Sequence, residues 1–149
     1  MIVLDTPASM KSRLVGAWKL VSYCVRTAGS DIHFPYGEEP VGLLLYTDTG
    51  YMSAQIMKPE RARQHRPGTE TIEELKSSYN GYIAYFGTYT VSEDSKSVTH
   101  HVEGSLHTWI LQTEQKRFIN LNGTTLILTA EVKSGLKTRL HEITWKRVE

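Results

Sequence analysis

The stretch RFINLNGTTLILT, residues 117–129, decides the fold class. Apolar and polar residues alternate on both sides of Asn122-Gly123, a dipeptide that strongly favours a two-residue type I′ turn. Alternation with period two is typical of a strand that buries one face. The stretch therefore predicts an antiparallel hairpin that turns at Asn122 and Gly123.

The same alternation recurs along most of the chain and is interrupted at short intervals by turn residues. This pattern predicts an all-β sandwich or barrel. The expected strands lie near residues 17–26, 41–47, 51–57, 87–92, 97–107, 116–121, 125–132 and 138–147. Because 149 residues is the length of one typical domain, we expect residues 1–149 to form a single domain.

One segment, TIEELKSSYNGYIAYF at residues 71–86, departs from the strand pattern. Its apolar residues are spaced by three and four, which is typical of one face of a helix. Thr71 and Glu74 form a capping-box pair, in which each side chain accepts a hydrogen bond from the other's backbone N–H. Gly81 costs about 1 kcal/mol relative to alanine, so the helix can bend or end there. We expect one helix inserted near residues 71–86.

Charge and composition narrow the class of partner. The chain has 17 Lys and Arg against 16 Asp and Glu, and a net charge of +1 provides no long-range attraction for nucleic acid or a membrane surface. Cys24 is the single cysteine, which excludes an internal disulfide and a thiolate-rich zinc site. The longest apolar run, Val41–Tyr46, is far too short to span a membrane, and MIVLDTPASMK at the start is too polar for a signal peptide. We expect a cytoplasmic protein whose partner is a small molecule.

Several segments resemble the lipocalin-like domain family of calycin-type barrels. Gly16-Ala17-Trp18 opens the first expected strand, and Trp145-Lys146-Arg147 lies on the last. The more specific segments are PYGEEPVGLLLYTDTGYMSAQIMKPER, GYIAYFGTYTV, VTHHVEGSL and TEQKRF. The resemblance covers about residues 14–147. It implies a closed antiparallel barrel of about 8–10 strands with an internal cavity, in which a basic residue of the last strand packs over Trp18.

The segment VTHHVEGS, residues 98–105, contains the candidate catalytic residues. Neighbouring side chains of a strand point to opposite faces, so His100 and His101 cannot bind one metal ion without a bulge. The residue pattern alone favours His100 inside the barrel with a backbone or hydroxyl partner. The alternative places His101 and Glu103 inside, where the carboxylate orients the imidazole as a general base. Because the polar elements carry the family resemblance, we adopt this alternative and keep His100 as a further catalytic candidate.

A polar lumen also predicts the residues that bind the substrate. Hydrogen-bonding candidates on the strands are Tyr51, Ser53, Gln55 and Arg117. Tyr85 and Trp109 would form an aromatic wall around a planar ligand, although core packing is the more common role of such side chains. The apolar strand faces would then point outward and need a cover, either the helix or a second copy of the chain in a homodimer.

Three functions are compatible with this pattern. The first is a cofactor-independent isomerase, cyclase or dehydratase of natural-product biosynthesis, in which His101 and Glu103 move a proton on a small, partly apolar metabolite. The second is a non-catalytic carrier or sensor that holds such a molecule. The third is a metal or haem protein, but the chain contains no H-E-x-x-H motif and no cysteine pair. We expect neither a metal nor a cofactor.

Overall fold

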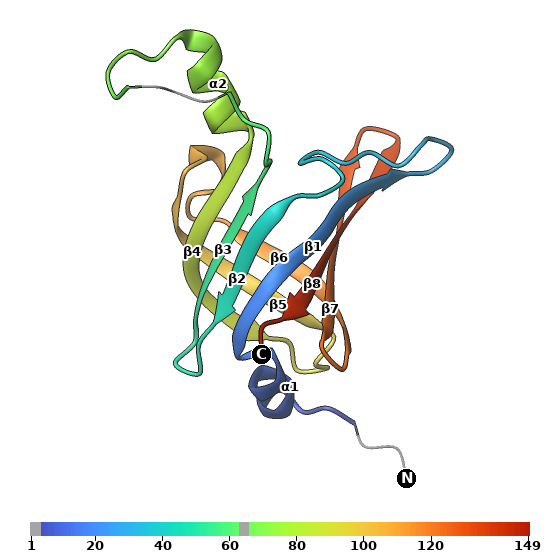
Figure 1. Ribbon diagram of the computed structural model, residues 1–149. Coiled ribbons are helices and arrows are strands. Elements are labelled where there is room, and N and C mark those ends of the chain that lie inside the picture. Colours follow the sequence, from blue (N-terminus) through green and yellow to red (C-terminus); the bar gives the residue numbers. More distant parts are fainter. Residues whose placement is uncertain (1–3, 63–65) are drawn as a thin grey trace.

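A computed structural model describes residues 4–62 and 66–149. In these residues eight antiparallel strands form a closed barrel, in which each strand pairs with its neighbours in the chain and β1 pairs with β8 (Figure 1). The strands are β1 (Gly16–Thr27), β2 (Val41–Tyr46), β3 (Tyr51–Met57), β4 (Tyr82–Val91), β5 (Ser97–Ser105), β6 (Glu114–Asn122), β7 (Thr125–Ser134) and β8 (Lys137–Arg147). The predicted closed barrel is confirmed, with a strand number at the lower end of the expected range.

The hairpin predicted from residues 117–129 consists of β6 and β7. Asn122 pairs with Thr125, so the two loop residues are Gly123 and Thr124. Gly123 has a φ of 61°, a conformation that glycine adopts without steric cost. The hairpin is confirmed, and its turn lies one residue later than predicted because Asn122 remains in the strand pairing.

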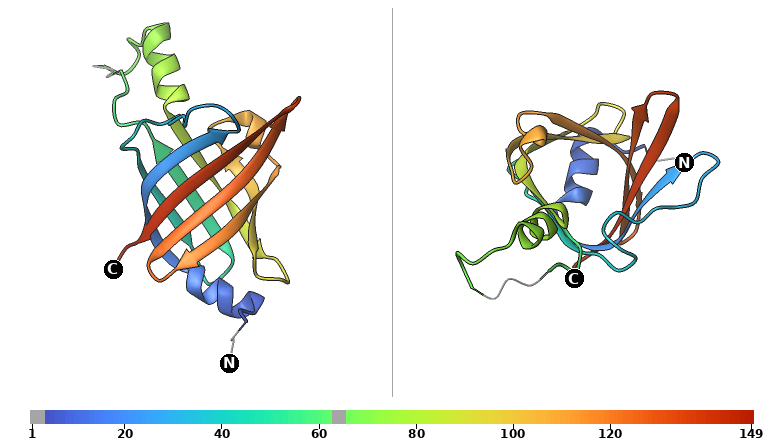
Figure 2. Two further views of the ribbon diagram at one scale, coloured as in Figure 1. Left: turned by 90° about the vertical axis from the view of Figure 1, so that its right-hand side faces the viewer. Right: turned by 90° about the horizontal axis from the view of Figure 1, so that it is seen from above.

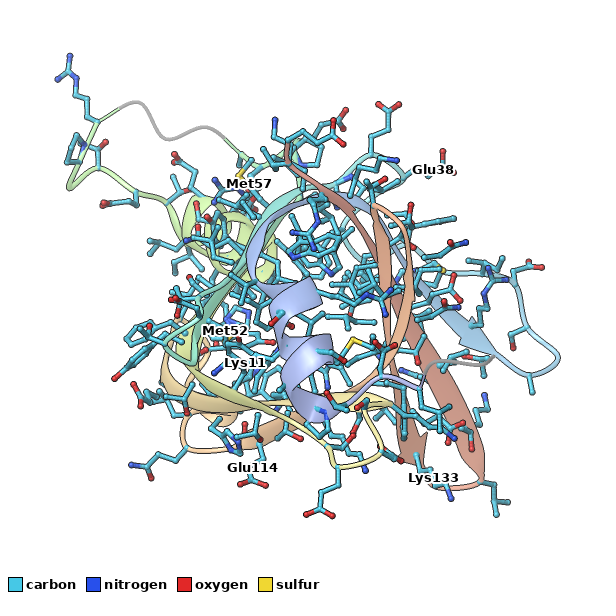
Figure 3. The ribbon with its side chains drawn as sticks, turned by 90° about the horizontal axis from the view of Figure 1, so that it is seen from below. Lys11, Glu38, Met52, Met57, Glu114 and Lys133 are labelled. Carbon is cyan, nitrogen blue, oxygen red and sulfur yellow. The ribbon has the colours of Figure 1, made fainter. Side chains whose placement is uncertain are left out.

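A short helix that the sequence reasoning did not predict, α1 (Pro7–Leu14), precedes the barrel. Thr6 and Ser9 cap it reciprocally, each side chain accepting a hydrogen bond from the other's backbone N–H, and Pro7 occupies the first turn. Met10 and Leu14 are buried in the core. Figure 3, seen from below, shows α1, which contains the labelled Lys11, lying across the lower end of the barrel.

The helix predicted near residues 71–86 corresponds to α2 (Ile72–Asn80). The prediction is wrong for residues 81–86, which are not helical. The capping box of Thr71 and Glu74 is confirmed, with both hydrogen bonds at 3.1 Å. The helix ends at Asn80, and the following residues form β4, which pairs with both β3 and β5. Pairing on two sides outweighs the helical spacing, because aromatic and β-branched residues fit a pleated surface well.

Helix α2 projects from the end of the barrel opposite to α1 (Figures 1 and 2), and none of its residues is buried. The η1 turn (Thr108–Ile110) lies at the same end, between β5 and β6. Among the described residues, neither α1 nor α2 has the length and apolar character that a membrane-spanning helix needs.

The lower half of the barrel is filled by side chains. Leu14, Trp18, Val98 and Leu126 have no measurable exposure. The indole Nε1 of Trp18 donates a hydrogen bond of 2.9 Å to the Leu14 carbonyl, and the guanidinium of Arg147 lies 4.2 Å from the centre of the indole ring. The packing of a basic residue of the last strand over Trp18, implied by the family resemblance, is confirmed. The barrel is therefore closed at the α1 end.

The outer face of β2 and β4 carries large apolar side chains. Val41, Leu43, Leu45 and Phe86 are all exposed on it. The pairing of Leu45 with Ser53, and of Ser53 with Phe86, places these side chains in one row across three strands. A homodimer that covers this face stays a prediction.

Candidate ligand-binding site

The upper half of the barrel encloses a cavity of about 560 Å³. Its apolar lining includes Leu44, Ala54, Ile56, Ile83, Leu128 and Ile143, and Trp145 also lines it. The polar side chains that line the cavity and are buried or half-buried are Tyr23, Tyr85, His100, Gln115, Arg117 and His141. Sites for small molecules typically measure roughly 300–1,000 Å³ and combine apolar walls with a few placed polar groups, so this cavity has the size and lining of such a site.

His100 on β5 is held between two tyrosine hydroxyls. Its Nε2 lies 2.6 Å from the hydroxyl of Tyr46, and its Nδ1 lies 2.7 Å from the hydroxyl of Tyr85. Burial, together with the nearby positive charge of Arg117, lowers the pKa of His100 to about 3. The ring is therefore neutral near pH 7, with one nitrogen that donates a hydrogen bond and one that accepts.

A second tyrosine–histidine pair lies on the adjacent strands β1 and β8. The hydroxyl of Tyr23 is 2.7 Å from Nδ1 of His141. Burial lowers the pKa of His141, with a further contribution from Arg117, and burial raises the pKa of Tyr23. At neutral pH this pair, like the first, supplies hydrogen bonds without a net charge.

Arg117 provides positive charge at the cavity wall. It lies in phase with Ile119 and Leu121 on the inner face of β6, as the sequence pattern predicts. Its guanidinium donates to the Gln115 side chain at 3.2 Å and to the Lys116 carbonyl at 3.0 Å. Within the part of the chain that the structure describes, no carboxylate lies within ion-pair distance of it. An uncompensated guanidinium favours a ligand that presents an electron-rich atom.

The cavity mouth lies beside η1 and α2. Trp109 of η1 lines the cavity but is 69% exposed, so its indole stands at the entrance. The neighbouring His107 stacks on Tyr79 of α2, with the ring centres 4.2 Å apart. This contact ties the end of α2 to the entrance.

The structure brings four of the nine predicted site residues to the cavity and leaves five outside. His100, Tyr85, Trp109 and Arg117 line it. Tyr51, Ser53, Gln55, His101 and Glu103 lie on the outer face. The predicted polar lumen is wrong, because the alternate residues of β3, Met52, Ala54 and Ile56, point inward and are almost fully buried. Burying these apolar side chains is favourable, whereas enclosing the carboxylate of Glu103 would remove its hydration.

His101 does have a carboxylate partner, but it is not Glu103. Its Nδ1 lies 3.2 Å from the carboxylate of Glu114, which is its cross-strand neighbour on β6. Its Nε2 lies 2.9 Å from the hydroxyl of Thr90. Cross-strand neighbours are closer than residues two apart on one strand, which explains the choice of partner. Figure 3 shows Glu114 at the periphery of the barrel, where it also borders the cavity.

Sequence reasoning missed the hydroxyls that hold the buried histidines. The site residues predicted from the sequence include neither Tyr46 and Tyr23 nor His141. Tyr46 is in phase with the buried Leu44, which is a sequence signal for an inward position. Its histidine partner lies 54 residues away in the chain, so the contact itself has no local signature.

Metal ligands do not gather in the described ranges 4–62 and 66–149. No group of three His, Cys, Asp or Glu residues there is placed to hold an ion. Both ring nitrogens of His100 are engaged by hydroxyls, so an axial bond to a haem iron would require breaking one of these hydrogen bonds.

A closed antiparallel barrel with one sealed end and a cavity of ligand size is the architecture of small-molecule-binding barrels. The chain belongs to the lipocalin-like domain family, whose model matches residues 15–148. It is 31% identical over 110 residues to the 4′-hydroxy-3′-methoxypropiophenone carrier protein of Aspergillus oryzae, and the alignment covers 65% of this chain and 96% of that protein. No solved structure matches the chain significantly.

Proposed function

We propose that the protein is a carrier that holds one small, partly apolar aromatic molecule inside its barrel. The observation that carries this proposal is His100, a neutral histidine with both nitrogens bonded to tyrosine hydroxyls, in the wall of an otherwise largely apolar cavity. The cavity volume and the named carrier function of the Aspergillus oryzae relative support it.

The geometry favours carriage over catalysis. A general base needs a nitrogen within reach of the substrate and a pKa near the working pH. His100 has no free nitrogen, and burial lowers its pKa to about 3. His101 and Glu103, on which the isomerase, cyclase or dehydratase hypothesis depends, lie outside the cavity. We therefore prefer the non-catalytic alternative, with a ligand drawn from natural-product metabolism.

Within this proposal Arg117 and Tyr85 contact the polar end of the ligand. Leu44, Ile56 and Ile143 contact its apolar part, since these side chains form the surrounding walls. Trp109 contacts the ligand during entry, because it lies at the mouth and is largely exposed. Tyr51, Ser53 and Gln55 have no part in binding.

The test is a calorimetric titration with 4′-hydroxy-3′-methoxypropiophenone, the ligand named for the relative. We expect saturable binding of one molecule per chain, and recovery of the compound unchanged after prolonged incubation and extraction. Conversion of the compound would contradict a purely carrying role. Absence of binding would contradict the proposal for aryl ketones.

Two matched variants locate the bound molecule. Ala54→Leu adds volume on the inner face of β3, where Ala54 lines the cavity, and we expect affinity to fall at least about tenfold. Ala84→Leu makes the same change at a position of β4 paired with the exposed Gln55, and we expect unchanged affinity. Thermal unfolding of both variants verifies that they are folded. Equal affinities would mean that the ligand binds elsewhere.

A further inference from the structure

The side chains of Tyr46, His100 and Tyr85 form a hydrogen-bonded series that has more polar hydrogens than hydrogen bonds. The two contacts join the Tyr46 hydroxyl to Nε2 and the Tyr85 hydroxyl to Nδ1. Two hydroxyls and one neutral imidazole carry three polar hydrogens, but the two contacts use only two of them. One polar hydrogen therefore makes no hydrogen bond within the series, and it belongs either to the Tyr46 hydroxyl or to the Tyr85 hydroxyl.

The surroundings of the two hydroxyls decide which hydrogen is left over. Tyr46 is 2% exposed, does not line the cavity, and its hydroxyl has no second partner among the described residues. A buried hydroxyl hydrogen without an acceptor is costly, so Tyr46 donates to Nε2. Nδ1 then carries the ring hydrogen and donates to the oxygen of Tyr85. The hydrogen left over is that of the Tyr85 hydroxyl, and Tyr85 lines the cavity.

We propose that the Tyr85 hydroxyl, oriented by His100 and Tyr46, is a hydrogen-bond donor that selects ligands with a carbonyl oxygen, with a ketone as the representative class. The inference rests on the proposed carrier function and specifies its ligand. Tyr85 is a specificity-determining residue in this scheme, and Tyr46 is a positioning residue that never touches the ligand.

Other groups of the cavity agree with an acceptor on the ligand. The indole Nε1 of Trp145 is buried without a hydrogen-bond partner in the described part of the chain, and Trp145 lines the cavity. Arg117 adds a positive charge nearby, and no carboxylate of the described residues lies within ion-pair distance of it. Burial raises the pKa of Tyr85 to about 12, so its hydroxyl keeps the hydrogen that it would donate. Two exposed carboxylates, Glu114 and Glu131, also line the cavity, so the groups that favour an accepting oxygen are the less exposed Tyr85, Trp145 and Arg117.

The hydrogen-bond chain can be tested without any ligand. In ¹⁵N NMR of the histidine rings, the two neutral tautomers give distinct nitrogen shifts, and substitution of His100 assigns its signals. We expect Nδ1 to carry the hydrogen and Nε2 to be bare. A ring protonated at Nε2 would overturn the inference, because Tyr85 would then donate to the ring and have no hydrogen for a ligand.

The ligand preference is tested with two matched probes. One is 4′-hydroxy-3′-methoxypropiophenone, and the other is its analogue with a methylene group in place of the carbonyl. The readout is the ratio of the two affinities, which cancels the shared aromatic contacts. We expect Tyr85→Phe to lower this ratio about tenfold, because one neutral hydrogen bond is lost. An unchanged ratio would overturn the inference.

Tyr89→Phe is the control for removal of a tyrosine hydroxyl. Tyr89 lies on the same strand, but its hydroxyl donates to the Thr47 carbonyl at 2.7 Å and it does not line the cavity. We expect this variant to keep the wild-type ratio, and a fall equal to that of Tyr85→Phe would count against the inference. Binding of neither probe by the wild-type protein would contradict the carrier function for aryl ketones. The His100 tautomer would still show whether the hydrogen of the Tyr85 hydroxyl is available to a ligand.

Discussion

The guanidinium of Arg147 lies over the indole of Trp18 and also donates a hydrogen bond of 2.9 Å to the Val15 carbonyl. The same guanidinium donates to the carbonyl of Arg13. One side chain thus ties the last strand to the end of α1 and to the start of β1. This contact seals the lower end of the barrel, below the cavity.

We expect Arg147→Met to lower the free energy of unfolding by about 2 kcal/mol. The variant keeps apolar volume over Trp18 but removes the cation–π contact and the charged donors to two carbonyls. Urea denaturation measures the loss. Lys146→Met, at the exposed neighbouring position, is the control, and equal losses in the two variants would contradict a sealing role for Arg147.

His100 makes the stability depend on pH below neutrality. Its pKa is about 3 in the folded protein against 6.5 as the ordinary value. Between these values the unfolded chain binds a proton that the folded protein does not, so acid favours unfolding. Stability is full above about pH 6.5, and His100 lowers it by up to about 1.4 kcal/mol per pH unit as the pH falls toward 3.

The measurement is the free energy of unfolding of wild type and His100→Gln from pH 7 to pH 4. Glutamine both donates and accepts hydrogen bonds but does not titrate, so we expect a flatter pH dependence in this variant. His33→Gln removes an exposed histidine and serves as the control. Parallel curves for wild type and His100→Gln would show that His100 does not titrate below its ordinary range.

The outer histidine is expected to have no role in binding. We predict that His101→Ala and Glu103→Ala both leave the affinity for the propiophenone within about twofold of wild type, since neither residue lines the cavity. The loss of the His101–Glu114 contact should cost at most about 1 kcal/mol, because the pair is partly exposed. A tenfold loss of affinity in either variant would support the polar lumen predicted from the sequence.

Tyr46→Phe tests whether the orientation of Tyr85 is set from outside the cavity. Without the Tyr46 hydroxyl, Nε2 of His100 loses the donor that favours the ring hydrogen on Nδ1, so the two neutral tautomers become closer in free energy. We expect part of the protein to carry the ring hydrogen on Nε2, with Tyr85 donating to Nδ1, and the ratio of ketone to methylene affinities to fall, although Tyr85 is unchanged. ¹⁵N NMR and calorimetry measure the two effects. An Nδ1-protonated ring with the wild-type ratio would contradict the positioning role.

Much of the fold could be predicted from the sequence because strand alternation is a local property. The hairpin of β6 and β7 and the inward position of Arg117 follow from period two alone. The end of α2 cannot be predicted in this way, because residues 82–86 fit both the alternation of a strand and the spacing of a helix. Their pairing with β3 and β5 decides the outcome, and this information is distributed over the whole barrel.

The site was harder to predict than the fold. Alternation divides β5 into the set of His100 and the set of His101, and the residue pattern favours the set of His100 inside, whereas the family resemblance favours the set of His101. The apolar residues of β3 decide this, because Met52, Ala54 and Ile56 point inward and share the barrel interior with His100. A histidine among apolar residues then needs hydroxyl partners, and those of His100 come from β2 and β4. Such a contact becomes visible only when the barrel is closed.

A crystal structure of the protein with 4′-hydroxy-3′-methoxypropiophenone would test the central claim most directly. We predict one molecule between Ala54, Ile143 and Tyr85, with its carbonyl oxygen within hydrogen-bond distance of the Tyr85 hydroxyl. A molecule bound only on the outer face, or one whose carbonyl points away from Tyr85 toward the mouth, would contradict the account.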